Sequence, residues 1–200
     1  PPAAGFAAWT TYDVAAPTPP AAVTSVTDAW VHNELDPNDS VITSTSWYDP
    51  AGQSDDWIVS PAIAMPATGP LSLSWTELAQ DPQFPDGYEV YASTGGSTPA
   101  DFLGASGTLI YSTPAASATE AAQSIDVSAF LGQTVHFAWR NNSNDQFLLH
   151  IDDILVLYDS KNGSPAVMDV IAKHKVPFIN IPVEDHFGRQ KNFLSDRGNG

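Results

Sequence analysis

The sequence contains no cysteine in its 200 residues and only seven basic residues. Without thiols, disulfide scaffolds, thiolate zinc sites, iron–sulfur centres and thiol nucleophiles are all excluded. Twenty-three acidic residues bring the formal net charge to −16, and a field of that sign excludes a nucleic-acid binder that relies on phosphate contacts. No apolar run approaches the roughly 20 residues that cross a bilayer, so we expect no membrane span.

The residues that are present suffice for a folded domain. Apolar types make up 42% of the chain and aromatic types 10%, which indicates a packed core rather than disorder. The chain starts Pro1-Pro2, without an initiator methionine or a signal-peptide pattern, which is typical of a mature or trimmed product.

Charge divides the chain into two regions. Residues 1–160 contain nineteen acidic residues and a single basic one, Arg140, so their net charge is −18. Residues 161–200 contain six basic and four acidic residues, so their net charge is +2. The change falls at a turn-rich stretch that ends in Gly163-Ser164-Pro165. We therefore predict one acidic domain over residues 1–160 and a C-terminal extension over residues 161–200.

Short alternating segments dominate the acidic region. In Leu71–Thr76 and in Thr134–Trp139 every second residue is apolar, the pattern of a strand with one buried face. Further strands are predicted at Ala29–Leu35, Val41–Trp47, Asp56–Ser60, Tyr88–Ser93, Thr108–Ser112, Ser124–Val127 and Phe147–Tyr158. Many short strands separated by Pro, Gly and Asp turns favour a β-sandwich.

The extension follows a different pattern. Ser164–Lys175 is predicted as a short helix, with Ser164 as N-cap and Pro165 in the first position. Residues 176–183 are extended and apolar with a proline near each end, which suits the edge of a sheet. The side chains that would bind or assemble there are Val176, Phe178, Ile179, Ile181 and Val183.

Three acidic clusters are candidates for a metal site: residues 36–39, residues 54–57, and Asp145 together with residues 151–154. Adjacent carboxylates beside apolar strand residues are costly unless neutralised, and Ca²⁺ accepts six to eight oxygens from such loops. The candidate ligands are Asp55, Asp56, Asp145, Asp152 and Asp153. The alternative is that they form solvated turns and caps.

Asp152 and Asp153 are the strongest candidates, because successive residues of a strand face opposite sides. One of the two would then point toward the core and need a cation or a hydrogen-bond donor. Arg140 is the obvious alternative partner, in a structural ion pair.

No pattern points to catalysis. The five histidines form no metal-binding box, and no nucleophile elbow or phosphate-binding glycine loop is present. Trp57, Trp75 and Trp139 fall on strand patterns and are predicted to be core residues. The other aromatic residues are placed less regularly, and exposed ones would suit sugar stacking or a protein interface.

Several segments, in this order, resemble the cleaved-adhesin family, also called choice-of-anchor J domains. Residues 54–63 resemble its D-W-L-I-S-P strand, and residues 88–94 with 101–102 resemble its middle part. Residues 125–135 resemble its I-D-L-S-x-Y-x-G-Q-x-V motif, and residues 137–142 with 147–154 resemble its closing strands. The resemblance covers about residues 1–159.

The resemblance implies a jelly-roll β-sandwich of two antiparallel sheets, found in secreted bacterial surface proteins as a non-catalytic, often calcium-bound adhesion module. It implies that the closing pair Asp152-Asp153 is among the calcium ligands. Family members usually begin with an F-x-E-x-F strand that is not found before Pro1-Pro2-Ala3-Ala4-Gly5-Phe6. Residues 176–183, from the same chain or a neighbouring copy, are a candidate to fill that place.

These observations predict an extracellular, calcium-stabilised adhesion or assembly module at the cell surface, with Ca²⁺ as cofactor. Its partners would be other copies of itself, or a surface protein or glycan. A specific form would be a filament subunit joined through the C-terminal extension. The alternative is a carbohydrate-binding accessory module of a larger secreted hydrolase.

Overall fold

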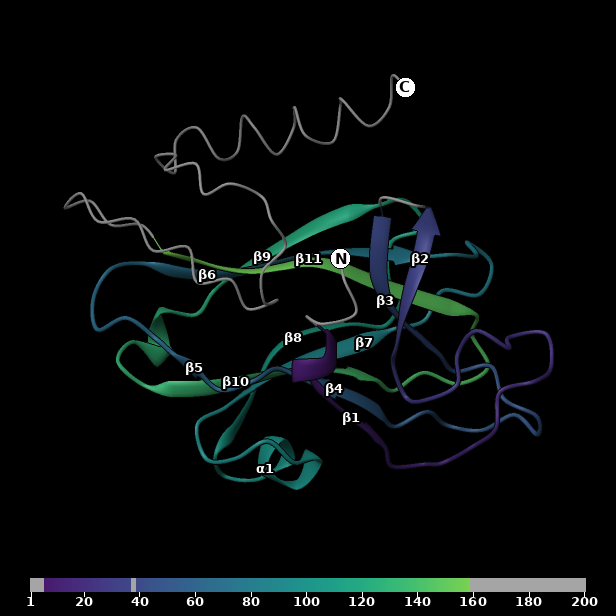
Figure 1. Cartoon of the computed structure of the whole chain (residues 1–200), viewed down its shortest axis with the longest axis horizontal. Coiled ribbons are helices and arrows are strands. Elements are labelled where there is room, and N and C mark those ends of the chain that lie inside the picture. The colour runs from purple at the N-terminus through teal and green to yellow at the C-terminus, as the bar shows by residue number, and fades with distance from the viewer. Residues whose placement is uncertain (1–5, 37–38, 159–200) are drawn as a thin grey trace, which may run out of the picture.

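Two antiparallel β-sheets pack face to face in the computed structural model, which describes residues 6–36 and 39–158 (Figure 1). The six-stranded sheet has the order β1-β4-β10-β7-β8, with β5 paired to β10 beside this path. Its strands are β1 (Thr10–Asp13), β4 (Asp56–Val59), β5 (Ile63–Ala64), β7 (Tyr88–Ser93), β8 (Gly107–Thr113) and β10 (Thr134–Asn141). The five-stranded sheet has the order β2-β3-β11-β6-β9. Its strands are β2 (Val31–Asp36), β3 (Asp39–Thr45), β6 (Leu71–Ala79), β9 (Ala121–Asp126) and β11 (Leu148–Tyr158).

Helical structure in these ranges is short. The helix α1 (Pro99–Leu103) and the 3-10 turns η1 (Phe6–Ala8) and η2 (Ser128–Phe130) connect or flank strands. At the start of α1, the backbone N–H of Thr98 donates to Asp101 Oδ2 over 2.9 Å. None of the described helices has the length and apolar character needed to traverse a bilayer. The predicted all-β sandwich of two antiparallel sheets is thus confirmed, and each strand that we expected is present with ends shifted by a few residues.

The main core lies between the two sheets. Trp75 of β6 and Trp139 of β10 are buried there edge to face, with ring centroids 5.8 Å apart. Trp30 lies in the same cluster, although its irregular sequence context did not predict burial. A second, smaller cluster includes Trp57, whose ring stacks on Phe102 of α1 at 5.7 Å. Figure 1 places α1 on the outer side of the six-stranded sheet, so that sheet has apolar contacts on both faces.

The alternation argument for Asp152 and Asp153 is wrong. The pairing of β11 with β6 shifts register between Asp152 and Leu155, and Asp153 has a positive φ of 49°. Such a bulge inserts an extra residue and breaks the two-residue period of the strand. Ile151 and Ile154 therefore both enter the core, while Asp152 is half-buried and Asp153 is exposed.

The predictions for the C-terminal extension fall on residues that lie outside the described part of the chain. These are the boundary near residue 160, the helix at Ser164–Lys175 and the extended segment with Val176, Phe178, Ile179, Ile181 and Val183. They stay predictions from the sequence.

Candidate functional site

Strand register aligns several polar residues at one end of the six-stranded sheet. Asn141 of β10 lies opposite Asp56 of β4 on one side and Tyr88 of β7 on the other, and Tyr88 lies opposite Thr113 of β8. These four residues form a row across the sheet at the level where its strands begin or end. The chain segments just beyond the row, around residues 53, 85, 114 and 142–146, therefore gather at the same end of the sandwich.

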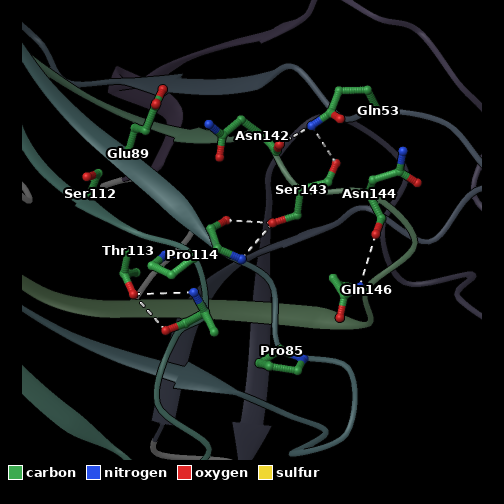
Figure 2. A pocket seen from close by; sticks show the side chains of 12 residues that line it. Gln53, Pro85, Glu89, Ser112, Thr113, Pro114, Asn142, Ser143, Asn144 and Gln146 are labelled. Carbon is green, nitrogen blue, oxygen red and sulfur yellow. Dashed lines mark hydrogen bonds between the residues drawn. The ribbon is translucent and has the colours of Figure 1, made fainter.

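An open depression of about 660 Å³ lies between these segments. Its walls carry mainly side-chain amides and hydroxyls, together with one carboxylate, from Gln53, Glu89, Ser112, Thr113, Asn142, Ser143, Asn144 and Gln146. Figure 2 shows the four amide side chains along one side of the depression, with Ser112, Thr113 and Pro114 across from them. This chemistry suits a ligand rich in hydroxyl groups, because an amide both donates and accepts hydrogen bonds.

Part of this polar lining stabilises the loop between β10 and β11, residues 142–147. Gln53 Nε2 donates to the backbone carbonyl of Asn142, and to that of Ser143 over 3.1 Å. Gln146 Nε2 donates to the carbonyl of Asn144 over 3.0 Å. The side-chain amides of Asn142 and Asn144 have no hydrogen-bond partner in the parts of the chain that the structure describes. These two amides are therefore available to a ligand.

Gly87 fixes the floor of the depression. Its N–H donates to Ser143 Oγ over 2.6 Å, and Ser143 Oγ donates to the Gly87 carbonyl over 3.1 Å. A Cβ atom on residue 87 would lie 2.6 Å from the carbonyl oxygens of Thr113 and Pro114. Only glycine lets the start of β7 approach the end of β8 this closely.

Arg140 organises the outer face of the sheet next to the depression. Its Nε donates to Asp55 Oδ1 over 2.7 Å and its Nη1 donates to Glu89 Oε2 over 3.1 Å. The guanidinium also lies 5.1 Å from the centre of the Trp57 ring, in cation–π geometry. Asp55 further accepts from Trp57 Nε1 over 2.7 Å. This network sets the position of Glu89, the carboxylate in the wall of the depression.

The five aspartates named as calcium ligands lie in different places. Asp55 belongs to the Arg140 network, and Asp56 is buried at the start of β4. Asp145 is exposed in the loop between β10 and β11 with a φ of 54°, and Asp152 and Asp153 lie at the bulge of β11 in the other sheet. Within residues 6–36 and 39–158, no group of three or more His, Cys, Asp or Glu side chains could hold a metal ion.

Sequence reasoning did not single out the amides of the depression. A signal was present, since residues 141–146 form an unbroken polar run between two predicted strands. A run of that kind in a loop at the end of a rigid sheet is a common place for binding residues. Gln53 and Glu89 lie far away in the chain and join this run only through the pairing of β4 and β7 with β10.

The fold and this site define a class: an all-β sandwich that presents an open polar surface at one end. A family model described as Cleaved Adhesin Domain matches residues 6–156, and the chain belongs to this family. Cleaved adhesin domains are non-catalytic modules of larger proteins.

Solved structures show the same fold. The K3 cleaved adhesin domain of Lys-gingipain from Porphyromonas gingivalis is 21% identical, with a TM-score of 0.55 over 75% of this chain and 89% of that one. The K1 domain of the same protein is 19% identical, with a TM-score of 0.52 over 77% of this chain and 92% of that one. No curated protein sequence matches the chain.

Proposed function

We propose that this chain is an extracellular adhesion module that binds a neutral glycan at the cell surface through the amide-lined depression. The family match supports an adhesive, non-catalytic role and an extracellular location. The observation that carries the choice of ligand is the depression itself, in which the amides of Asn142 and Asn144 have no partner in the described chain.

The chemistry of the walls supports a sugar more than an apolar or charged ligand. Each sugar hydroxyl both donates and accepts, and side-chain amides and hydroxyls match that pattern. The one charged wall residue, Glu89, is already paired with Arg140. Phe84, which is 49% exposed, precedes the wall residue Pro85 in the chain and does not itself line the depression.

The test is binding of the protein to an array of immobilised neutral glycans, followed by titration with the best ligand. The double variant Asn142→Ala/Asn144→Ala is expected to bind about five- to hundredfold more weakly, because each lost hydrogen bond contributes about 0.5–1.5 kcal/mol.

Gln123→Ala is the matched control. It removes one amide from β9, in the other sheet and outside the depression, and should leave the affinity unchanged. Glycan binding that survives the double variant, or binding only to surface proteins, would contradict the proposal.

Assembly is a second role that the sequence favours. A filament subunit joined through Val176, Phe178, Ile179, Ile181 and Val183 remains a prediction, since these residues lie outside the described ranges. This role predicts that the full chain self-associates and that a chain without residues 161–200 does not. Sedimentation velocity of these two proteins tests the prediction.

A further inference from the structure

Strand β11, an inner strand of the five-stranded sheet, is paired on both sides over only part of its length. Residues 148–151 lie between β3 and β6, with Leu148 opposite Thr45 and Ile151 opposite Ile42 on the β3 side. Residues 155–158 continue the pairing with β6 alone. In the described part of the chain, the second half of β11 therefore has one open side, which we call the β11 slot.

The bulge of β11 explains why β3 separates from it. The register of β11 with β6 shifts between Asp152 and Leu155, and Asp153 has a positive φ of 49°. A bulge bends the strand that contains it, so β11 turns away from β3 at this point. β3 itself continues beside β2, with Val41 opposite Asn33. The slot thus opens on the β3 side of β11, directly after the bulge.

The slot is apolar and uncharged. Residues 155–158 have the sequence Leu-Val-Leu-Tyr. Val156 is buried in the main core, whereas Leu155 and Leu157 are half-buried on the opposite face and belong to none of the core clusters of the described residues. Backbone N–H and C=O groups on the open side of a strand are a template for a further strand. The slot therefore fits an extended segment without charged side chains.

The outer edges of the two sheets are less suited to accept a strand. β1 and β9 end in Asp13 and Asp126, and β2 carries Glu34. The register of β8 with β7 shifts between Val90 and Tyr91. Charged side chains and bulges are devices that protect sheet edges from further pairing. Within residues 155–158 the slot has neither device.

Residues 176–183 match this slot in length and chemistry. They lie outside the described ranges, and their sequence is apolar and contains no charged residue. Between Pro177 and Pro182 lie the four residues 178–181, each with a backbone N–H, and residues 155–158 of the slot are also four. Proline donates no ladder hydrogen bond, so strand pairing of this segment is confined to the central run.

The segment is tethered to the slot by its own chain. Tyr158, the last residue of the slot, is followed by 17 residues before Val176, and a connection of that length spans at most about 60 Å. A tethered segment meets its site at an effective concentration that separate molecules reach only at roughly millimolar levels. Residues 161–200 carry a net charge of +2 and residues 1–160 one of −18, so the extension is attracted to the sandwich, whereas two sandwiches repel each other.

We propose that residues 176–183 pair with residues 155–158 of β11 in the same chain and add a strand to the five-stranded sheet. The C-terminal extension is then part of the fold of this module. The assembly role described above requires the same segment to leave its own chain for the slot of a neighbouring copy. The two arrangements are therefore distinct outcomes of one experiment.

The sequence of the segment also sets its orientation. Successive residues of a strand face opposite sides, so Ile179 and Ile181 share one face, and Phe178 and Asn180 share the other. An asparagine that faces the core needs a buried hydrogen-bond partner. The isoleucines therefore face the core, and Phe178 and Asn180 lie on the outer face beside Leu157.

Engineered disulfides test this pairing directly, because the natural chain has no cysteine. In the full chain, Leu157→Cys is combined in turn with Phe178→Cys, Ile179→Cys, Asn180→Cys and Ile181→Cys, and each double variant is oxidised in dilute solution. A disulfide needs Cα atoms about 4.4–6.8 Å apart and Cβ atoms that face each other, which residues on the same face of neighbouring strands provide. We expect an intrachain disulfide with position 178 or 180, formed at least about fivefold more than with position 179 or 181. Peptide mass spectrometry and non-reducing electrophoresis measure it.

Two further cysteine positions complete the design. Leu155→Cys repeats the scan two residues along the slot, so that a pairing whose register misses Leu157 is still detected. Ser124→Cys is the matched control, because Ser124 of β9 lies on the same face of the sheet as Leu155, in line with it through Ser74. Ser124 is exposed at the far edge of the sheet, and its variant should link to none of the four positions.

Two results would overturn the proposal. No disulfide with either slot cysteine, or equal linking at all four positions, would mean that the segment does not pair with β11. Disulfides found only between chains would place the segment in the slot of a neighbouring copy and would support the assembly role instead. Neither result would bear on glycan binding, because no wall residue of the amide-lined depression belongs to β11.

Discussion

Replacing Asp86 with asparagine is expected to flatten the dependence of folding stability on pH by about 1.4 kcal/mol per pH unit between about pH 4 and pH 7. Asp86 is fully buried, with Ser46 Oγ donating to its Oδ1 over 2.6 Å and no partner for its Oδ2. Burial raises the pKa of this carboxyl from 3.8 to about 7, against the hydrogen bond from Ser46. Below about pH 7 the side chain is thus a neutral acid in the folded protein.

The direction of the effect follows from proton counts. Between pH 3.8 and about 7 the folded protein keeps the proton on Asp86 while the unfolded chain releases it. The wild type therefore loses stability as the pH rises through this interval, by about 4 kcal/mol in total from this group. Asparagine carries no such proton, so the variant should be the more stable protein at pH 8.

Urea unfolding of both proteins at several pH values measures this difference. Asp56 also has a raised pKa, so only the difference between wild type and variant isolates Asp86. Asp126→Asn is the matched control. The pKa of this exposed carboxyl is shifted in the opposite direction, because hydrogen bonding from Ser128 lowers it. Its contribution is present above pH 3.8 and is lost on acidification, so its removal should leave the slope from pH 4 to 7 unchanged. Parallel curves for wild type and Asp86→Asn would show that Asp86 is ionised in the folded protein.

Tyr88→Phe is expected to lower the free energy of unfolding by about 2–5 kcal/mol. The Tyr88 hydroxyl of β7 donates to Glu77 Oε2 of β6 and accepts from Trp75 Nε1 over 2.7 Å. Glu77 is buried, and its Oε1 accepts from the backbone of Ser117 over 3.0 Å. The variant would leave a carboxylate oxygen and an indole N–H without partners between the two sheets.

A double-mutant cycle separates this network from simple packing. Glu77→Leu and Tyr88→Phe together should cost about 1–3 kcal/mol less than the sum of the single variants, since the double variant removes both partners of one hydrogen bond. Tyr91→Phe is the control, because it removes a tyrosine–glutamate bond of 2.8 Å to Glu89 on the outer face of the same sheet. A loss for Tyr88→Phe no larger than that for Tyr91→Phe would contradict the buried network.

The strands were predictable because burial of one face leaves a mark in the sequence. Val135, Phe137 and Trp139 occupy every second position of β10, and all three are buried. The same rule failed at Asp152 and Asp153, because a bulge needs no special residue type and leaves no period to detect. Alternation is thus a reliable guide only where the pairing register is continuous.

The candidate site was much less predictable, because it is made of contacts between distant segments. Asn142 and Asn144 belong to one visible polar run, but Gln53 and Glu89 reach the depression only through strand order. The partners of Arg140, which are Asp55 and Glu89, could not be chosen from among nineteen acidic residues by spacing alone.

The single arginine in the described part of the sandwich also bears on the glycan binding that we propose. Arg140 is already paired with Asp55 and Glu89. Residues 6–36 and 39–158 contain no other lysine or arginine that could pair with an anionic sugar at the depression. Sialic acids, uronic acids and sulfated sugars would therefore be repelled at long range, whereas neutral hexoses would not. The Debye length falls from about 10 Å at 0.1 M salt to about 3 Å at 1 M. The repulsion of anionic sugars should therefore be stronger at low salt and weaker at high salt.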